Sequence, residues 1–145
     1  MIRSLLLLVV LFSQSVDAQW QSALQSSHIE ANVPSAEAFE PLLRRDLLAF
    51  FARADASVTS VEFKLLRNGP TQSGVAYPKY YLWVKAFAGA TRKEEGAARV
   101  AAINRERFEV TDFLSKAKVQ ASPSEVGATF PAALIPSITS LAAAK

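Results

Sequence analysis

Residues 80–87, which read YYLWVKAF, decide the fold predicted for this chain. The run is rich in aromatic and β-branched side chains, which strands favour. Successive side chains of a strand point to opposite faces. Both faces of this strand are apolar, with Tyr80, Leu82, Val84 and Ala86 on one and Tyr81, Trp83 and Phe87 on the other. Such a strand belongs inside a sheet, with another layer covering each face.

Two further strands are predicted beside it. Residues 61–65 (VEFKL) alternate between apolar and charged side chains. Asn68-Gly69-Pro70 ends that strand, because Asn-Gly supplies a positive φ and proline cannot continue the ladder. Downstream we place a turn at residues 89–96 and a long third strand at residues 97–113. The polar residues 104–107 interrupt this strand and indicate a β-bulge or a short turn.

Residues 36–54 predict the longest helix of the domain, because apolar side chains recur there at spacings of three and four. Pro41 would cost a hydrogen bond inside this helix. We therefore expect the regular helix to begin at Pro41, after a looser turn at residues 35–40. The apolar stripe consists of Phe39, Leu43, Leu47, Phe50 and Ala54.

Two short helices are predicted at the C-terminus. Ser122-Pro123-Ser124-Glu125 has the form of a capping box with proline at the first helical position. The first helix should cover residues 123–130. After Pro131, the second should begin at Ala132 or Pro136 and end at Ala143.

The predicted fold is therefore α+β, with a long N-terminal helix packed on a curved antiparallel sheet of at least three strands and short C-terminal helices. This order is similar to that of cystatin-like and nuclear-transport-factor-like folds, in which a helix lies in a curved antiparallel sheet. The likeness is one of element order, and no family motif accompanies it.

The first eighteen residues have the three-part pattern of a secretory signal peptide, with Arg3, an apolar run at residues 5–12 and then Val16-x-Ala18. The run is much shorter than the roughly 20 residues of a membrane-spanning helix. We expect residues 1–18 to be a signal peptide and residues 19–145 to form one α+β domain with a flexible arm at 19–34. The protein should then be secreted or periplasmic, without a membrane span.

The composition excludes several kinds of chemistry. The 145 residues include no cysteine and one histidine, so thiol nucleophiles, disulfides and zinc sites with sulfur or several histidine ligands are excluded. No nucleophile elbow, P-loop or dinucleotide-binding glycine motif occurs. We expect no metal and no cofactor. The net charge of +3 is thinly spread, and nucleic acid is not an expected partner outside the cell.

Asp112 is the candidate catalytic residue, because a carboxylate between apolar neighbours can have a raised pKa and act as a general base. Tyr80 is the tyrosine expected to point inward beside it. Together they would make a small pocket enzyme of the nuclear-transport-factor-like type, an isomerase or a hydrolase. In the alternative, Asp112 caps a loop or pairs with an arginine or lysine of a neighbouring strand.

A basic and aromatic sheet face is the candidate binding site, since such faces take anionic ligands or protein partners. In the alternative it is a solvated face with glutamates as ion-pair partners. Either the C-terminal helices or another chain must cover its aromatic side chains. The predicted function is an exported, non-enzymatic binding or protein-interaction domain for an unknown protein partner or small ligand, with a homodimer through the sheet face as one option. The candidate residues are Tyr81, Trp83, Lys85, Arg99, Arg105 and Arg107.

Overall fold

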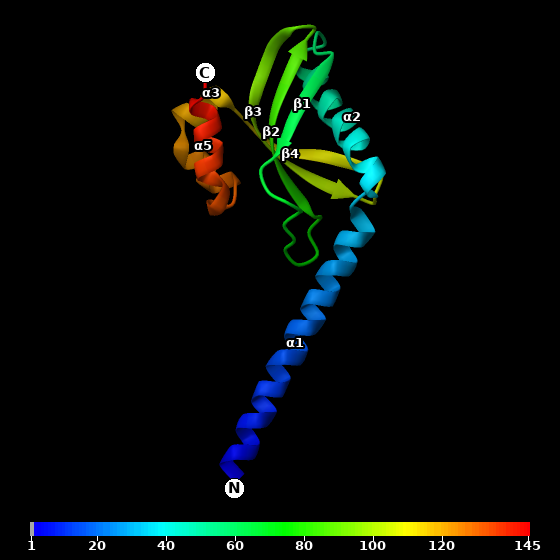
Figure 1. The fold of residues 1–145 in the computed structure, drawn as a ribbon, viewed down its shortest axis with the longest axis vertical. Coiled ribbons are helices and arrows are strands. Elements are labelled where there is room, and N and C mark those ends of the chain that lie inside the picture. The colour runs from blue at the N-terminus through cyan, green and yellow to red at the C-terminus, as the bar shows by residue number, and fades with distance from the viewer. Residues whose placement is uncertain (1) are drawn as a thin grey trace.

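The computed structural model describes residues 2–145, with side chains from Asp17 onward. Two helices come first, followed by a four-stranded antiparallel sheet in the order β1-β2-β3-β4 and by short C-terminal helices (Figure 1). The elements are α1 (Ile2–Asn32), α2 (Ala36–Ala54), β1 (Ser60–Leu65), β2 (Lys79–Ala88), β3 (Thr91–Ile103), β4 (Arg107–Ser115), α3 (Lys116–Ala121), α4 (Pro123–Thr129), the 3₁₀ turn η1 (Ala132–Leu134) and α5 (Ile135–Ala143).

This order confirms the predicted α+β class and the central place of residues 80–87, which lie in β2 between β1 and β3. The sheet is curled but does not close. The likeness to cystatin-like or nuclear-transport-factor-like folds is not confirmed. Within residues 17–145, whose side chains the structure describes, no helix combines the length and the hydropathy that crossing a bilayer requires.

Each face of the sheet is covered by a different part of the chain. Helix α2 packs on the inner face, where Leu43 and Leu47 are fully buried against Leu82 and Val84. The C-terminal helices pack on the outer face, where Val126 and Ile138 lie against Tyr81 and Trp83 (Figure 1). The chain's own tail therefore covers these two aromatic side chains, which is one of the two options that the sequence left open.

Helix α2 does not begin at Pro41, as predicted, but five residues earlier at Ala36. The Phe39 N–H donates to the Ser35 carbonyl, which closes the first turn. The Phe39 ring packs edge-on against Tyr80 and Phe108, with ring centroids 4.9 and 5.0 Å apart. These tertiary contacts hold the first turn in helical form and offset the cost of the interior proline.

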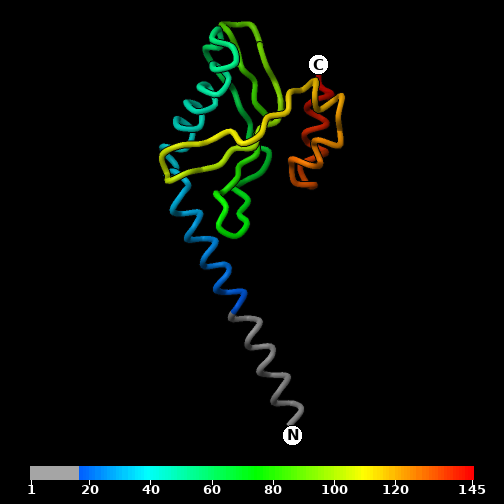
Figure 2. Tube along the Cα trace, turned by 180° about the vertical axis from the view of Figure 1, so that it is seen from behind, coloured from blue at the N-terminus to red at the C-terminus, as the bar shows by residue number. Residues whose placement is uncertain are grey.

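The predicted third strand at residues 97–113 is in fact two strands. Residues 104–106 form a turn in which Asn104 and Arg105 have φ values of 53° and 63°. Asn32, at the end of α1, fixes this turn: its side-chain oxygen accepts from the Asn104 N–H at 3.0 Å, and its carbonyl accepts from the Arg105 N–H at 2.8 Å. Figure 2 shows this yellow turn beside the end of α1.

The turn predicted at residues 89–96 is much shorter than expected. It occupies Gly89 and Ala90, and β3 already begins at Thr91. Gly89 has a φ of 59°, which glycine adopts without strain. Residues 92–95 therefore lie in the sheet, where their side chains can reach its faces.

The C-terminal region has one helix more than predicted. Helix α4 begins at Pro123 as expected, but the Ser122 side chain makes no capping hydrogen bond. The Ser122 N–H instead donates to the Lys118 carbonyl, and this bond closes the last turn of α3. Ser122 has φ −136° and ψ 70°. The serine that does cap a helix is Ser115, whose hydroxyl accepts from the Lys118 N–H at 3.2 Å.

Helix α1 is longer than the partly helical arm that was predicted and runs without a break to Asn32. Most of the predicted signal peptide falls on residues 1–16, whose side chains lie outside the described part of the chain. The signal peptide and the domain boundary after it stay predictions.

Candidate functional site

Asp112 and Tyr80 lie on opposite faces of the sheet. Asp112 accepts a hydrogen bond from Arg99 Nε at 2.7 Å, and the same guanidinium donates to the Thr129 carbonyl of α4 on the outer face. Tyr80 is buried on the inner face, where burial raises its pKa. Asp112 therefore pairs with an arginine of the neighbouring strand, which was the predicted alternative to a catalytic role.

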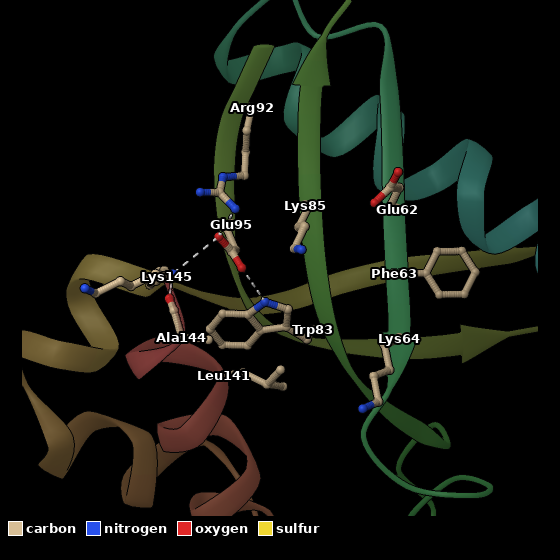
Figure 3. Close-up of a pocket in the computed structure, with 11 residues that line it drawn as sticks. Glu62, Phe63, Lys64, Trp83, Lys85, Arg92, Glu95, Leu141, Ala144 and Lys145 are labelled. Carbon is tan, nitrogen blue, oxygen red and sulfur yellow. Dashed lines mark hydrogen bonds and ion pairs between the residues drawn. The ribbon is translucent and has the colours of Figure 1, made fainter. Parts of the chain in front are cut away.

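The predicted basic residues do not form one patch. Arg99 is engaged by Asp112. Arg105 lies in the β3–β4 turn, and Arg107 lies just after it, 3.8 Å from Glu109 in an exposed pair of the kind that contributes little stability. Of the predicted cations, Lys85 is the one that lies beside Trp83, where both line a pocket of about 240 Å³ (Figure 3).

This pocket, called the Trp83 pocket below, lies on the outer face of β1, β2 and β3, where the end of α5 approaches the sheet. Its strand residues come together through the antiparallel register, because directly paired residues share a face. Lys85 pairs with Glu62 on one side and Glu95 on the other, and Trp83 pairs with Lys64.

Glu95 organises one side of the pocket. It is 8% exposed, and its Oε1 accepts a hydrogen bond from Trp83 Nε1 at 2.9 Å, which fixes the orientation of the indole. Its Oε2 lies 2.8 Å from a guanidinium nitrogen of Arg92 and 3.7 Å from Lys116 Nζ. Oε2 accepts no aligned hydrogen bond from the described residues, so these contacts are ion pairs. Two cations thus compensate a carboxylate that would be costly to bury alone.

The end of α5 forms the wall opposite the strands. Lys116 Nζ donates to the Ala144 carbonyl at 2.5 Å, and Gln120 Nε2 donates to the Ala142 carbonyl at 2.6 Å. These bonds from α3 hold the tail in place, so that Leu141 supplies an apolar side chain and Lys145 a charged one to the pocket.

Three lysines of the pocket make no close ion pair with a side-chain carboxylate. Among the side chains described, no carboxylate oxygen lies within 4 Å of the ammonium groups of Lys64, Lys85 or Lys145. The pocket therefore combines a net positive charge, from five cations against Glu62 and Glu95, with the edge of the buried Trp83 indole and the Leu141 side chain.

Such a site can bind an anion. Lysine ammonium groups donate to carboxylate, sulfonate and phosphate oxygens. Within the described side chains, no cluster of three metal-ligating residues occurs.

Reasoning from the sequence found Trp83 and Lys85 but missed Arg92 and Glu95, because residues 89–96 were assigned to a turn. The alternation of Glu62 and Lys64 with apolar residues predicted a solvated face for their strand, and the register shows that this face is the one that carries Trp83 and Lys85. Comparisons of the chain with protein-family models, curated proteins and solved structures find no match.

Proposed function

We propose that this chain is a non-enzymatic binding domain and that the Trp83 pocket takes an anionic group attached to a short apolar part. The observation that carries the proposal is the set of three lysines, Lys64, Lys85 and Lys145, that line the pocket beside the Trp83 indole and make no ion pair within 4 Å. Unpaired cations that share one pocket repel each other, and a bound anion relieves this repulsion.

The size of the pocket limits the ligand. Its volume of about 240 Å³ lies below the range of about 300–1,000 Å³ typical of sites for drug-sized molecules. A small carboxylate or phosphate with a short apolar chain fits this volume. The acidic end of a larger partner would place the same groups there.

Fluorescence of Trp83 tests the proposal. The chain has two tryptophans, and Trp20→Phe leaves Trp83 as the only one. In that variant, hexanoate and hexyl phosphate should change the emission to saturation, whereas hexanol, which has the same chain without the charge, should not. Lys85→Met should weaken binding of both anions by about tenfold to a hundredfold, because a hydrogen bond to a charged group contributes roughly 1.5–3 kcal/mol.

Arg107→Met is the matched control, because it removes a cation at the far end of the sheet, beside the β3–β4 turn. It should leave the affinity for both anions unchanged. Equal binding of hexanol, or equal weakening by Lys85→Met and Arg107→Met, would show that the Trp83 pocket is not the site.

We also propose that the chain is exported and cleaved after Ala18, on the pattern of Arg3, the apolar run and Val16-x-Ala18. N-terminal sequencing of the secreted or periplasmic protein should then begin at Gln19. Recovery of the chain with Met1 intact in a membrane fraction would contradict export with cleavage.

A further inference from the structure

Strand β1 lies at one edge of the sheet, and no strand of the described chain pairs with its outer side (Figure 1). Backbone groups of a strand alternate in direction. The Leu66 N–H donates to the Tyr81 carbonyl, so the even-numbered residues of β1 point their backbone groups at β2. The N–H and C=O groups of Val61, Phe63 and Leu65 therefore point outward and form the β1 edge.

Arg44 of α2 binds one of these outward groups, the Val61 carbonyl. Its Nη1 donates to the Val61 carbonyl at 2.5 Å, and its guanidinium lies over the Phe63 ring, 5.1 Å from the centroid. This cation occupies the place that the N–H of an added strand would take. Edge strands with open backbone groups are templates for pairing with another chain.

We propose that the β1 edge pairs with the β1 edge of a second copy of this chain, antiparallel and centred on Phe63. A two-fold axis through Phe63 places Phe63 opposite its own copy and Val61 opposite Leu65 of the second copy. All of these residues present outward backbone groups, so the N–H and C=O groups of both edges meet once the Arg44 side chain releases the Val61 carbonyl. The two sheets would join into one of eight strands.

Charge selects this register. Centred on Phe63, the pairing puts Glu62 opposite Lys64 of the second copy, and this occurs twice by symmetry. A shift of the centre to Glu62 puts two glutamates opposite each other, and a shift to Lys64 puts two lysines opposite each other. Like charges directly opposite destabilise a strand pair. The sequence of β1 is thus complementary to itself in one of these three registers.

This inference does not depend on the Trp83 pocket as a ligand site. Pairing would engage Lys64 with Glu62 of the second copy and would leave Lys85 and Lys145 for an anion. The dimer edge also differs from the outer sheet face, which the C-terminal helices cover.

Charge exchange at two positions tests the proposal by sedimentation velocity over a range of concentrations. The wild-type chain should show a weak monomer–dimer equilibrium. Glu62→Lys alone and Lys64→Glu alone should each raise the dimer dissociation constant about tenfold, because two symmetry-related pairs change from opposite to like charge. The double variant Glu62→Lys/Lys64→Glu restores opposite charges and should recover the wild-type constant. Melting curves check that each variant is folded.

Leu65→Pro provides a second test. Its N–H points outward, so proline removes a donor from the β1 edge without removing a bond to β2. This variant should keep the wild-type melting midpoint and lose dimerisation. A wild-type chain that stays monomeric up to about 1 mM, or a double variant no better than the single ones, would overturn the proposal.

Discussion

Replacing Gly96 by alanine should destabilise the fold strongly, because β3 and β4 approach closely at this residue. A Cβ built at Gly96 would lie 2.2 Å from the Leu114 carbonyl oxygen and 2.8 Å from the Ser115 Cα. Both atoms belong to the β4 backbone, so no change of rotamer relieves the clash. Since ordinary contact begins near 3.4 Å, the two strands must separate by about 1 Å in a closely packed interior.

The magnitude follows from two costs. Overpacking of a well-packed site costs roughly 1–3 kcal/mol. Gly96 pairs with Ser115 at the end of the β3–β4 ladder, and separating the strands there weakens one or two backbone hydrogen bonds of about 1 kcal/mol each. We expect the free energy of unfolding to fall by about 3 kcal/mol in total.

Urea unfolding followed by circular dichroism measures this change, and Gly127→Ala is the matched control. The nearest atom to a Cβ at Gly127 is Ile135 Cδ1 at 3.7 Å, an ordinary contact. Gly127 lies within α4, where alanine in place of glycine should stabilise by roughly 0.5–1 kcal/mol. If the two variants unfold at the same urea concentration, the inference that β3 and β4 lie too close at Gly96 to admit a Cβ is wrong.

Two further predictions concern a helix cap and a buried tyrosine. Ser115→Ala should lower the free energy of unfolding by about 1 kcal/mol, because it leaves the Lys118 N–H without its partner. Ser122→Ala should change the free energy of unfolding little, since the Ser122 side chain makes no cap bond. Equal urea midpoints for the two variants would contradict the assignment of Ser115 as the cap. Burial raises the pKa of Tyr80 above its ordinary value of 10.0, so stability should be present below pH 10 and fall as the pH rises toward the folded-state pKa. Tyr80→Phe should lose less stability than wild type between pH 9 and 11 in urea titrations. Burial lowers the pKa of Lys79, so this residue makes stability rise with pH, and it does so equally in both proteins. Identical pH profiles for the two proteins would count against a buried Tyr80.

Local pattern in the sequence was enough to place most of the elements. The alternation in residues 61–65 and 80–87 identified β1 and β2, and the turn signals between them separated the two strands correctly. The helical spacing of apolar residues located α2, and Pro123 located the start of α4. These elements follow from interactions between residues that are near in sequence, together with one buried face.

Contacts between distant residues decided the rest. Helix α2 begins before Pro41 because Phe39 packs against Tyr80 and Phe108 from the sheet. The β3–β4 turn forms where Asn32, 72 residues earlier, supplies its hydrogen-bond acceptors.

The candidate site depended still more on tertiary structure. The sequence placed Trp83 and Lys85 on one strand, but only the register put Glu62 and Glu95 at Lys85's sides. Packing of the C-terminal helices then buried the indole and brought Lys116 and the end of α5 to the pocket. Periodicity along one strand shows which residues share a face. It carries no information about which distant segment covers that face, because the free energy of packing a segment there comes from burial and charge pairing between segments.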